Sequence, residues 1–402
     1  MTTAATKSNK DGALRWKASM MDNYGTPELT LTHGEGVYVY DADGNCYTDL
    51  LSGIAVNALG HAHPAVVAAV TRQVQTLSHV SNFYSHGPGL ALAQRLLDLV
   101  GVQGKVLFCN SGAEANETAL KLTRLTGRGK VIACEGAFHG RTMGALALTG
   151  QPGKQAPFEP LVPGVTHVAY GDEAALAAAV DTDTAAVFLE PVLGEGGVLP
   201  APDGYLNAAR EITGAAGALL VIDEVQAGIG RTGSWFAFQQ AGIVPDVVTL
   251  AKGLGGGLPL GAVLGLGAAA ELFTPGAHGT TFGGNPVCCA AGLAVLDTIA
   301  EHDLCAHAAA VGKHLTAGIE ALDHPLLGGV RGLGLLLGMT LGAPRAKAFV
   351  AAAQRRGYLL NAVAPEVVRI APPLILTEAQ ADEFLAVLPD ITDDALPTAE
   401  ER

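Results

Sequence analysis

The sequence lacks the cysteine patterns that accompany metal sites and disulfide frameworks. Its six cysteines include no C-x-x-C pair, which argues against a zinc site and against a small disulfide-bonded fold. Charged residues are also scarce: they make up 15% of the 402 residues, whereas 49% are hydrophobic. A disordered chain would show the opposite balance. We therefore expect a soluble, cytoplasmic globular protein without a bound metal.

Positive charge is in deficit, and so are long apolar runs. Lys and Arg number 24 against 38 Asp and Glu, a formal net charge of −14, so a basic face for nucleic acid or anionic lipid is not expected. The first twenty residues lack the continuous apolar stretch of a signal peptide. One uncharged and glycine-rich run, Leu254–Ala270, contains six glycines and is shorter than the roughly 20 apolar residues of a membrane helix.

Short apolar runs alternate with helical patterns in the middle of the chain. Consecutive apolar positions are typical of strands in a parallel sheet that helices cover on both faces. The predicted strands are Lys105–Cys109, Val131–Cys134, Ala186–Glu190, Leu219–Val225, Val247–Ala251 and Ala262–Gly265. The predicted helices are Pro64–Leu77, Ser111–Leu122, Leu206–Ile212 and Pro286–Ile299. The expected fold class is therefore α/β.

The two ends of the chain follow a different pattern. Residues Gly36–Leu50 alternate around a Gly-containing turn, as a hairpin does. The last hundred residues combine predicted helices with short strands, namely Ala306–Leu322, Ala346–Arg356, Gly332–Met339 and Val367–Ile370. We expect residues 61–290 to form a large cofactor-binding domain, and residues 1–60 and 291–402 to form a smaller α+β domain together. The polar tail after Asp390 is expected to be loose.

Three unusual segments follow predicted strands, where ligands bind in an open parallel sheet. Ser111-Gly112-Ala113 opens a helix whose free N–H groups attract anions, although Ser111 is equally typical of an ordinary N-cap. Asp223 ends an apolar strand and needs a cation or several donors there, which a structural ion pair would also provide. Lys252 ends the next strand, where a desolvated amine can attack a carbonyl, although most lysines are simply solvated.

Taken together, these segments indicate a single ligand. A phosphate, a protonated ring nitrogen and an aldehyde would occupy the three positions, and pyridoxal phosphate carries all of them. A competing motif, Gly228–Gly233, fits the dinucleotide fingerprint G-x-G-x-x-G. That fingerprint should follow a strand directly and precede an acid by about 20 residues, whereas Lys252 stands near that position. An NAD-linked oxidoreductase therefore stays the distant alternative.

Seven segments resemble, in order, those of the class III pyridoxal-phosphate aminotransferases of fold type I. The resemblance runs from about Asn23 to Thr377. It implies a large domain with a mostly parallel seven-stranded sheet, a smaller α+β domain, and a homodimer with shared active sites. The segments are Tyr24-Gly25-Thr26-Pro27, Gly53–His61, Asn110–Asn116, Phe138-His139-Gly140-Arg141-Thr142, Asp223-Glu224-Val225-Gln226, Ala251-Lys252-Gly253 and Thr281–Pro286.

The resemblance also implies roles for the cofactor residues. Lys252 would bind the aldehyde as a Schiff base and then move a proton, and Asp223 would pair with the pyridine nitrogen; these two are the expected catalytic residues. Gln226 would face the phenolic oxygen, and Phe138 would stack on the ring. The expected cofactor-binding set is Ser111, Gly112, Ala113, Phe138, Asp223, Glu224, Val225, Gln226, Lys252, and Thr281 contributed by the second subunit.

For the substrates, the resemblance implies two arginines, since a guanidinium binds a carboxylate with two hydrogen bonds. Arg141, with Thr280 nearby, would bind the carboxylate of N-acetylornithine, and Arg369 the α-carboxylate of glutamate. Glu195 would pair with Arg369 while the amine donor is bound. The expected reaction transfers an amine from N-acetylornithine to 2-oxoglutarate in arginine biosynthesis.

Two departures from the family pattern leave the donor open. Leu193 stands where Gln is common in the family, and Thr280 where Ser is common. The alternative donors are ornithine, succinylornithine, 4-aminobutyrate and acetyl-lysine. The presence of all four charged site residues argues against a protein that only binds the cofactor. These residues are Lys252, Asp223, Arg141 and Arg369.

Overall fold

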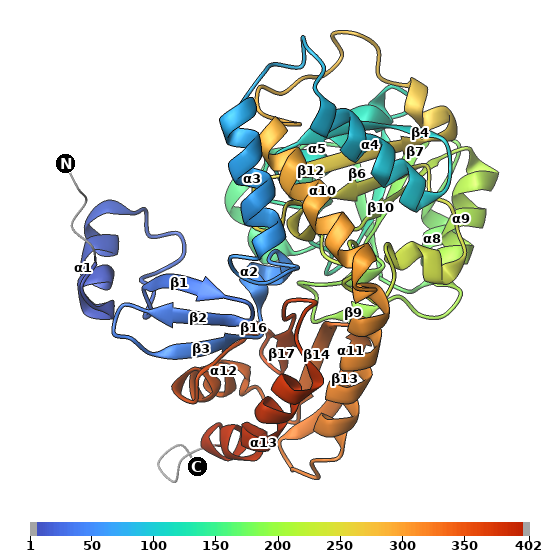
Figure 1. Ribbon diagram of the computed structural model, residues 1–402. Coiled ribbons are helices and arrows are strands. Elements are labelled where there is room, and N and C mark those ends of the chain that lie inside the picture. The colour runs from blue at the N-terminus through green and yellow to red at the C-terminus, as the bar shows by residue number, and fades with distance from the viewer. Residues whose placement is uncertain (1–5, 397–402) are drawn as a thin grey trace.

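A seven-stranded sheet forms the centre of the computed structural model, which describes residues 6–396 (Figure 1). Neighbouring strands run parallel except for β12, which is antiparallel to both of its neighbours. The mostly parallel seven-stranded sheet expected from the sequence is confirmed. In spatial order its strands are β4 (Gly104–Cys109), β12 (Gly261–Leu266), β11 (Val247–Leu250), β10 (Leu219–Asp223), β7 (Thr184–Leu189), β5 (Lys130–Cys134) and β6 (Val165–Val168).

Each face of this sheet packs against its own apolar layer. Val221 of β10 packs in one cluster with Ala119, whereas its neighbour Ile222 packs in a second cluster with Leu296. Because both faces are covered, the strands are apolar at consecutive positions. The helices of this region are α3 (Pro64–Thr76), α4 (Gly87–Val100), α5 (Gly112–Arg124), α6 (Met143–Leu148), α7 (Pro152–Gln155), α8 (Glu173–Ala179), α9 (Tyr205–Ala216) and α10 (Pro286–Glu301).

Two four-stranded sheets lie below the central sheet in the view of Figure 1. One is antiparallel and has the order β13 (Leu327–Leu333), β14 (Leu336–Leu341), β17 (Val367–Ile370), β16 (Asn361–Ala364). The other has the order β1 (Leu31–Glu35), β2 (Tyr38–Asp41), β3 (Cys46–Asp49), β15 (Tyr358–Leu359). The antiparallel pairing of β2 with β3 confirms the predicted hairpin.

The remaining elements join or flank these sheets. They are α1 (Asn9–Ser19), α2 (Ser52–Ala55), α11 (Leu304–Glu320), α12 (Ala346–Arg355), α13 (Glu378–Asp394), the strands β8 (Val192–Leu193) and β9 (Leu199–Pro200), and the 3-10 turns η1 (Ala156–Phe158), η2 (Ala237–Ala241), η3 (Lys252–Gly255) and η4 (Gly267–Glu271). In the described part of the chain, no helix combines the length and the apolar character needed to cross a membrane.

The division into residues 61–290 against 1–60 and 291–402 stays a proposal. It is supported by the parallel pairing of β3 with β15, which joins segments near the two ends of the chain in one sheet. The Ser52 hydroxyl also donates to the Ala371 carbonyl oxygen at 2.7 Å. Helix α10 crosses the proposed boundary at residue 290.

Two sequence expectations for the C-terminal part are wrong in detail. The chain does not become loose at Asp390, because α13 continues to Asp394 with Ile391 buried; residues 397–402 lie outside the described range. Segment Gly332–Met339 contains the end of β13, a hairpin turn and the start of β14 rather than one strand. Gly334 makes this turn with φ at +55°, a conformation that favours glycine.

Candidate active site

The carboxyl ends of β4, β10 and β11 open into one cavity of about 420 Å³. Because these three strands run in the same direction, their last residues meet at one edge of the sheet. The cavity wall brings together nine of the residues expected from the sequence: Ser111, Gly112, Ala113, Phe138, Arg141, Asp223, Val225, Gln226 and Lys252.

Lys252 enters this cavity from η3, directly after β11. Its φ of +42° is a left-handed conformation that costs energy in a residue with a Cβ. Desolvation lowers the pKa of its amine to about 8, and the positive charge of Arg369 contributes to the shift. An amine with this pKa is partly neutral near pH 7, so it can act as a nucleophile or a base.

Three donors surround the carboxylate of Asp223, the last residue of β10. The Asn116 side-chain amide donates to Oδ2 at 2.6 Å, and the Val225 backbone N–H donates to Oδ1 at 2.9 Å. His139 Nδ1 lies 2.7 Å from Oδ2. Burial lowers the pKa of His139, but its hydrogen bond to Asp223 and the charges of Asp223 and Glu190 outweigh burial and raise it. The donors explain how a carboxylate can lie at the end of an apolar strand.

The start of α5 forms a cradle beside Asp223. Ser111 caps the helix by accepting the Glu114 N–H at 3.1 Å, and its hydroxyl can still donate. Among the described residues, no backbone acceptor faces the N–H groups of Gly112 and Ala113. A Cβ at position 112 would lie 2.7 Å from Val225 Cγ1, so only glycine fits there. The free N–H groups and the helix dipole suit an anion.

Arg369 lies fully buried behind Gln226. Its Nη1 donates to Glu195 Oε1 at 2.5 Å and to Gln226 Oε1 at 2.9 Å, and its Nε donates to Asn361 at 3.1 Å. Burial raises the pKa of Glu195, but the charge and hydrogen bond of Arg369 outweigh burial and lower it. The Nη2 group has no hydrogen-bond partner within the described residues. A buried charge with one donor unused is suited to a second carboxylate.

Phe138 and Arg141 also line the cavity. The Phe138 ring is half-buried, and the guanidinium carbon of the exposed Arg141 lies 5.6 Å from its centroid. The Phe138 N–H donates to Glu190 Oε1 at 2.8 Å, which fixes the segment that carries both residues.

Five expected residues are absent from the cavity wall: Arg369 with its partner Glu195, Glu224, Thr280 and Thr281. The carboxylate of Glu224 turns away and accepts the Phe238 N–H at 2.9 Å. Thr280 accepts a hydrogen bond from Asn110, which lines the cavity, at 3.4 Å. Thr281 is exposed. The roles expected for these residues stay predictions.

The structure also adds residues that the sequence did not single out. Asn116, His139 and Glu190 line the cavity with Asp223. Burial raises the pKa of Glu190 to about 7. Glu190 directly follows β7, so the strand-end reasoning that found Asp223 applies to it too, whereas nothing in their spacing marks Asn116 and His139. Across residues 6–396, no group of three or more His, Cys, Asp or Glu side chains is placed to hold a metal.

The segment Gly228–Gly233 does not form a dinucleotide site. No helix opens from it, and the next helical turn is η2 at Ala237. A Cβ on Gly233 would lie 3.0 Å from the Cβ of Ala309 in α11, so its glycine permits close packing against that helix. This placement removes the basis for an NAD-linked oxidoreductase.

A desolvated lysine and a buried carboxylate at the ends of adjacent parallel strands define the class of protein. The family model described as "Aminotransferase class-III" matches residues 20–392, and the chain belongs to this family. Among curated relatives, it is 65% identical to the acetylornithine aminotransferase of Mycolicibacterium smegmatis over 381 residues, 95% of this chain and 98% of the relative. It is 60% identical to the acetylornithine aminotransferase of Streptomyces coelicolor, with 98% of each chain covered.

Solved structures agree on the fold. An ornithine aminotransferase from Toxoplasma gondii, described with partial occupancy of PLP at its active site, superposes with a TM-score of 0.93 at 30% identity and covers 97% of this chain and 95% of its own. The N-acetylornithine aminotransferase from Stenotrophomonas maltophilia superposes with a TM-score of 0.82 at 36% identity, over 92% of this chain and 97% of its own.

Proposed function

We propose that the chain transfers the terminal amine of N-acetylornithine to 2-oxoglutarate, giving N-acetylglutamate semialdehyde and glutamate, as a step of arginine biosynthesis. The observation that carries this proposal is the meeting of Lys252 and Asp223 in one cavity at the ends of adjacent strands. The choice of substrate is supported by relatives named acetylornithine aminotransferase at 60% and 65% identity over almost the whole chain.

Pyridoxal phosphate is the proposed cofactor, because the cavity suits each of its parts. The free N–H groups of Gly112 and Ala113 suit the phosphate. The carboxylate of Asp223 suits a protonated pyridine nitrogen, and the amine of Lys252 suits the aldehyde. When bound, the cofactor supplies an electron sink for the substrate carbon that loses a proton.

The residues of the chain provide the proton transfer and the orientation. Lys252, with a pKa of about 8, would take the proton from the substrate carbon at Nζ and deliver it to the carbon that carried the cofactor's aldehyde. Asp223 is already held by its donors, so no rearrangement is needed to keep the ring nitrogen in place. Gln226 Oε1 accepts from Arg369, which leaves its amide nitrogen to donate to the phenolic oxygen.

Two arginines divide the substrate carboxylates between them. Arg141, exposed beside Phe138, binds the carboxylate of N-acetylornithine, with Thr280 nearby. Arg369 is neutralised by Glu195 at 2.5 Å, an arrangement that suits a donor without a carboxylate at that position. Movement of Glu195 then frees the guanidinium for the α-carboxylate of 2-oxoglutarate or glutamate.

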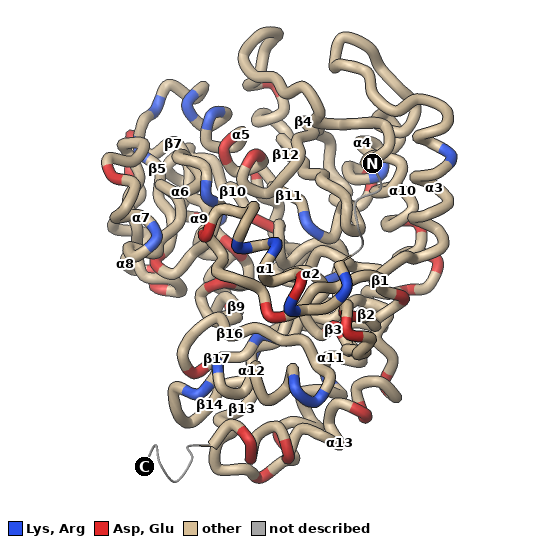
Figure 2. The backbone as a smooth tube through the Cα atoms, turned by 90° about the vertical axis from the view of Figure 1, so that its left-hand side faces the viewer, with Lys and Arg blue, Asp and Glu red and all other residues tan. Residues whose placement is uncertain are grey.

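A homodimer with shared active sites is part of the proposal. Large apolar side chains are exposed on two loops: Phe83 is 92% exposed, Tyr84 72% and Phe282 61%. The loops contact each other, since the Asn82 amide donates to the Gly283 carbonyl oxygen at 3.1 Å. Neither residues 77–90 nor residues 272–285 contain a charged side chain, and the tube is tan over the top of the molecule in Figure 2.

Such an uncharged apolar surface is typical of the core of a protein interface. Thr281 lies on the second loop, exposed and outside the cavity wall of its own chain. We propose that it completes the phosphate site of the second subunit. The exposed Val67 and Val74 of α3 extend the same apolar character.

Ornithine is the rival amine donor with an observation in its favour. The ornithine aminotransferase from Toxoplasma gondii superposes with the higher TM-score, whereas the N-acetylornithine aminotransferase from Stenotrophomonas maltophilia has the higher identity. Measurement of kcat/KM with N-acetylornithine, ornithine, succinylornithine, 4-aminobutyrate and acetyl-lysine separates these donors. A rate with free ornithine equal to or above that with N-acetylornithine would overturn the proposed substrate.

Fractionation of cells tests the predicted cytoplasmic location.

Lys252→Ala tests the mechanism. The variant should lose turnover, because it removes the amine that both joins the cofactor and moves the proton. It should also lose the visible absorbance band that the purified wild-type protein gains with pyridoxal phosphate. Lys313→Ala, a change on the exposed surface of α11, is the control and should keep both. Undiminished turnover in Lys252→Ala would contradict the mechanism.

A further inference from the structure

A lysine that the sequence analysis did not single out lies beside Phe138, a residue of the cavity wall. Lys154 belongs to α7, and its Nζ lies 5.6 Å from the centroid of the Phe138 ring. It donates a hydrogen bond to Gln151 Oε1, while Gln151 Nε2 donates to the Gly136 carbonyl oxygen at 3.1 Å. The ammonium group is therefore held beside a ring of the cavity wall instead of extending into solvent.

Lys154 and Arg141 place two positive charges around the same ring. The guanidinium carbon of Arg141 also lies 5.6 Å from the Phe138 centroid. Desolvation lowers the pKa of Lys154, and the charge of Arg141 adds to the shift. The nearby carboxylate of Glu195 is already engaged by Arg369. Within residues 6–396 neither cation forms an ion pair. Two close cations without an anionic partner favour the binding of an anionic ligand.

We propose that Lys154 is a specificity-determining residue of the amine-donor site, which acts with Arg141 to select a carboxylate whose neighbouring nitrogen is acylated. This inference rests on the proposed function. Free ornithine carries an ammonium group on the carbon next to its carboxylate, so it brings a third positive charge close to the pair. N-acetylation removes that charge and keeps the carboxylate. The same two cations therefore attract N-acetylornithine and disfavour free ornithine.

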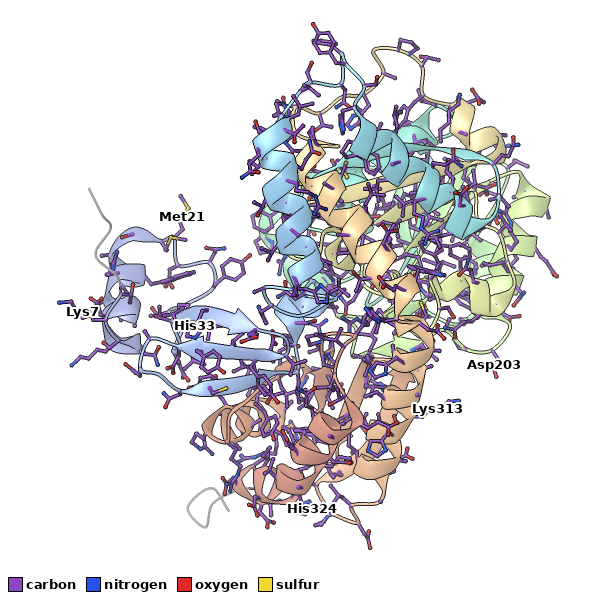
Figure 3. The ribbon with its side chains drawn as sticks, in the orientation of Figure 1. Lys7, Met21, His33, Asp203, Lys313 and His324 are labelled. Atoms are coloured by element: carbon purple, nitrogen blue, oxygen red, sulfur yellow. The ribbon has the colours of Figure 1, made fainter. Side chains whose placement is uncertain are left out.

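The test compares variants with and without a positive charge at position 154. Lys154→Met removes the charge and keeps the unbranched stem, whereas Lys154→Arg keeps the charge. Lys313→Met removes a positive charge from the surface of α11 (Figure 3) and is the matched control. Lys154→Gln replaces Lys154→Met if thermal unfolding shows that the methionine variant is misfolded.

Binding is measured without turnover. N-acetylnorvaline and norvaline match N-acetylornithine and ornithine but lack the reacting amine, so calorimetry gives a dissociation constant for each. We expect Lys154→Met to weaken N-acetylnorvaline binding about tenfold, or about 1.4 kcal/mol, and to change norvaline binding less than about twofold. The ratio of kcat/KM for N-acetylornithine over ornithine should fall by a similar factor. Lys154→Arg and Lys313→Met should keep the wild-type ratios.

Two outcomes overturn the inference: unchanged ratios in Lys154→Met, or equal losses for the acetylated and the free ligand. Failure of the proposed function gives a different result, because the wild-type protein would then not turn over N-acetylornithine. The calorimetric comparison of Lys154→Met with the wild type still measures the effect of the charge in that case.

Discussion

Two adjacent acids at the end of β10 have opposite surroundings. Asp223 faces the cavity and is surrounded by three donors. Glu224 faces the protein interior, where Oε1 accepts the Phe238 N–H and Oε2 has no hydrogen-bond partner in the described part of the chain. Burial raises the pKa of Glu224 to about 7. The first acid is thus placed for a ligand, and the second is a source of pH-dependent stability.

Glu224→Gln should change how stability depends on pH. The pKa of Glu224 is raised in the folded protein above its unfolded value of about 4.3. The stabilisation that the protonated Glu224 gives the folded protein is therefore fully present below about pH 4.3. It is lost as the pH rises through 7. The glutamine stays neutral, so the variant should match the wild type below about pH 4.3 and be more stable by about 3–4 kcal/mol at pH 8.5.

Thermal unfolding of the cofactor-free proteins at several pH values measures this difference. Glu190 also has a raised pKa. Because it is present in both proteins, its contribution to the pH dependence of stability cancels in the comparison. Parallel stability curves for wild type and variant from pH 5 to 8.5 would show that Glu224 does not titrate as inferred.

The sequence predicts the parts of the site that lie at strand ends. Asp223 and Lys252 could be found because a charged residue after an apolar strand is conspicuous. His139 and Asn116 could not, because they come from other segments and their use depends on the distance to Asp223 in the fold. Lys154 lies in the short helix α7, and its place beside Phe138 has no counterpart in the residue spacing.

At the scale of elements, the buried strands were the predictable part of the fold. The prediction missed β6, an edge strand with exposed or half-buried residues before Val168 and therefore without a continuous apolar run. It also could not distinguish the direction of β12, because an apolar run looks the same in a parallel and an antiparallel strand. The motif Gly228–Gly233 is explained by packing, since its glycines approach α11 and the loop before α13.

The contact between α5 and the segment after β10 gives a prediction at this scale. Gly112→Ala would place a Cβ 2.7 Å from Val225 Cγ1. We expect a loss of stability of about 1–3 kcal/mol and weaker binding of pyridoxal phosphate, because the N–H groups at the start of α5 must move. The double variant Gly112→Ala/Val225→Ala removes the clashing methyl groups and should recover much of both.

Thermal unfolding and a spectroscopic titration with pyridoxal phosphate measure the two effects. Gly153→Ala is a matched control, because a Cβ there meets no atom within 4 Å. If Gly112→Ala behaves like this control in both measurements, the cradle does not require glycine.

At the scale of the whole molecule, the uncharged loops predict the state of assembly. Phe83→Asp should convert the proposed dimer into a monomer, because it places a charge in an apolar interface. Activity should fall more than about tenfold, since Thr281 of the second subunit would no longer reach the phosphate site. Sedimentation measures the mass. Phe158→Asp changes a ring that is 54% exposed elsewhere and should leave the mass unchanged.

A variant of unchanged mass and activity, or a wild-type protein that sediments as a monomer, would contradict the proposed dimer. Partial loss of activity with an intact dimer would instead place Phe83 in the site without a role in assembly.

The pairing of β3 with β15 has a consequence for biosynthesis. The Ser52 hydroxyl bonds to the Ala371 carbonyl oxygen 319 residues later, and the Gln380 amide bonds to Tyr38 342 residues earlier. During translation the first hairpin therefore emerges long before its neighbours exist, and its edge stays open to wrong pairing until nearly the whole polypeptide has left the ribosome. Premature termination anywhere before residue 358 would leave that edge without its partner strand.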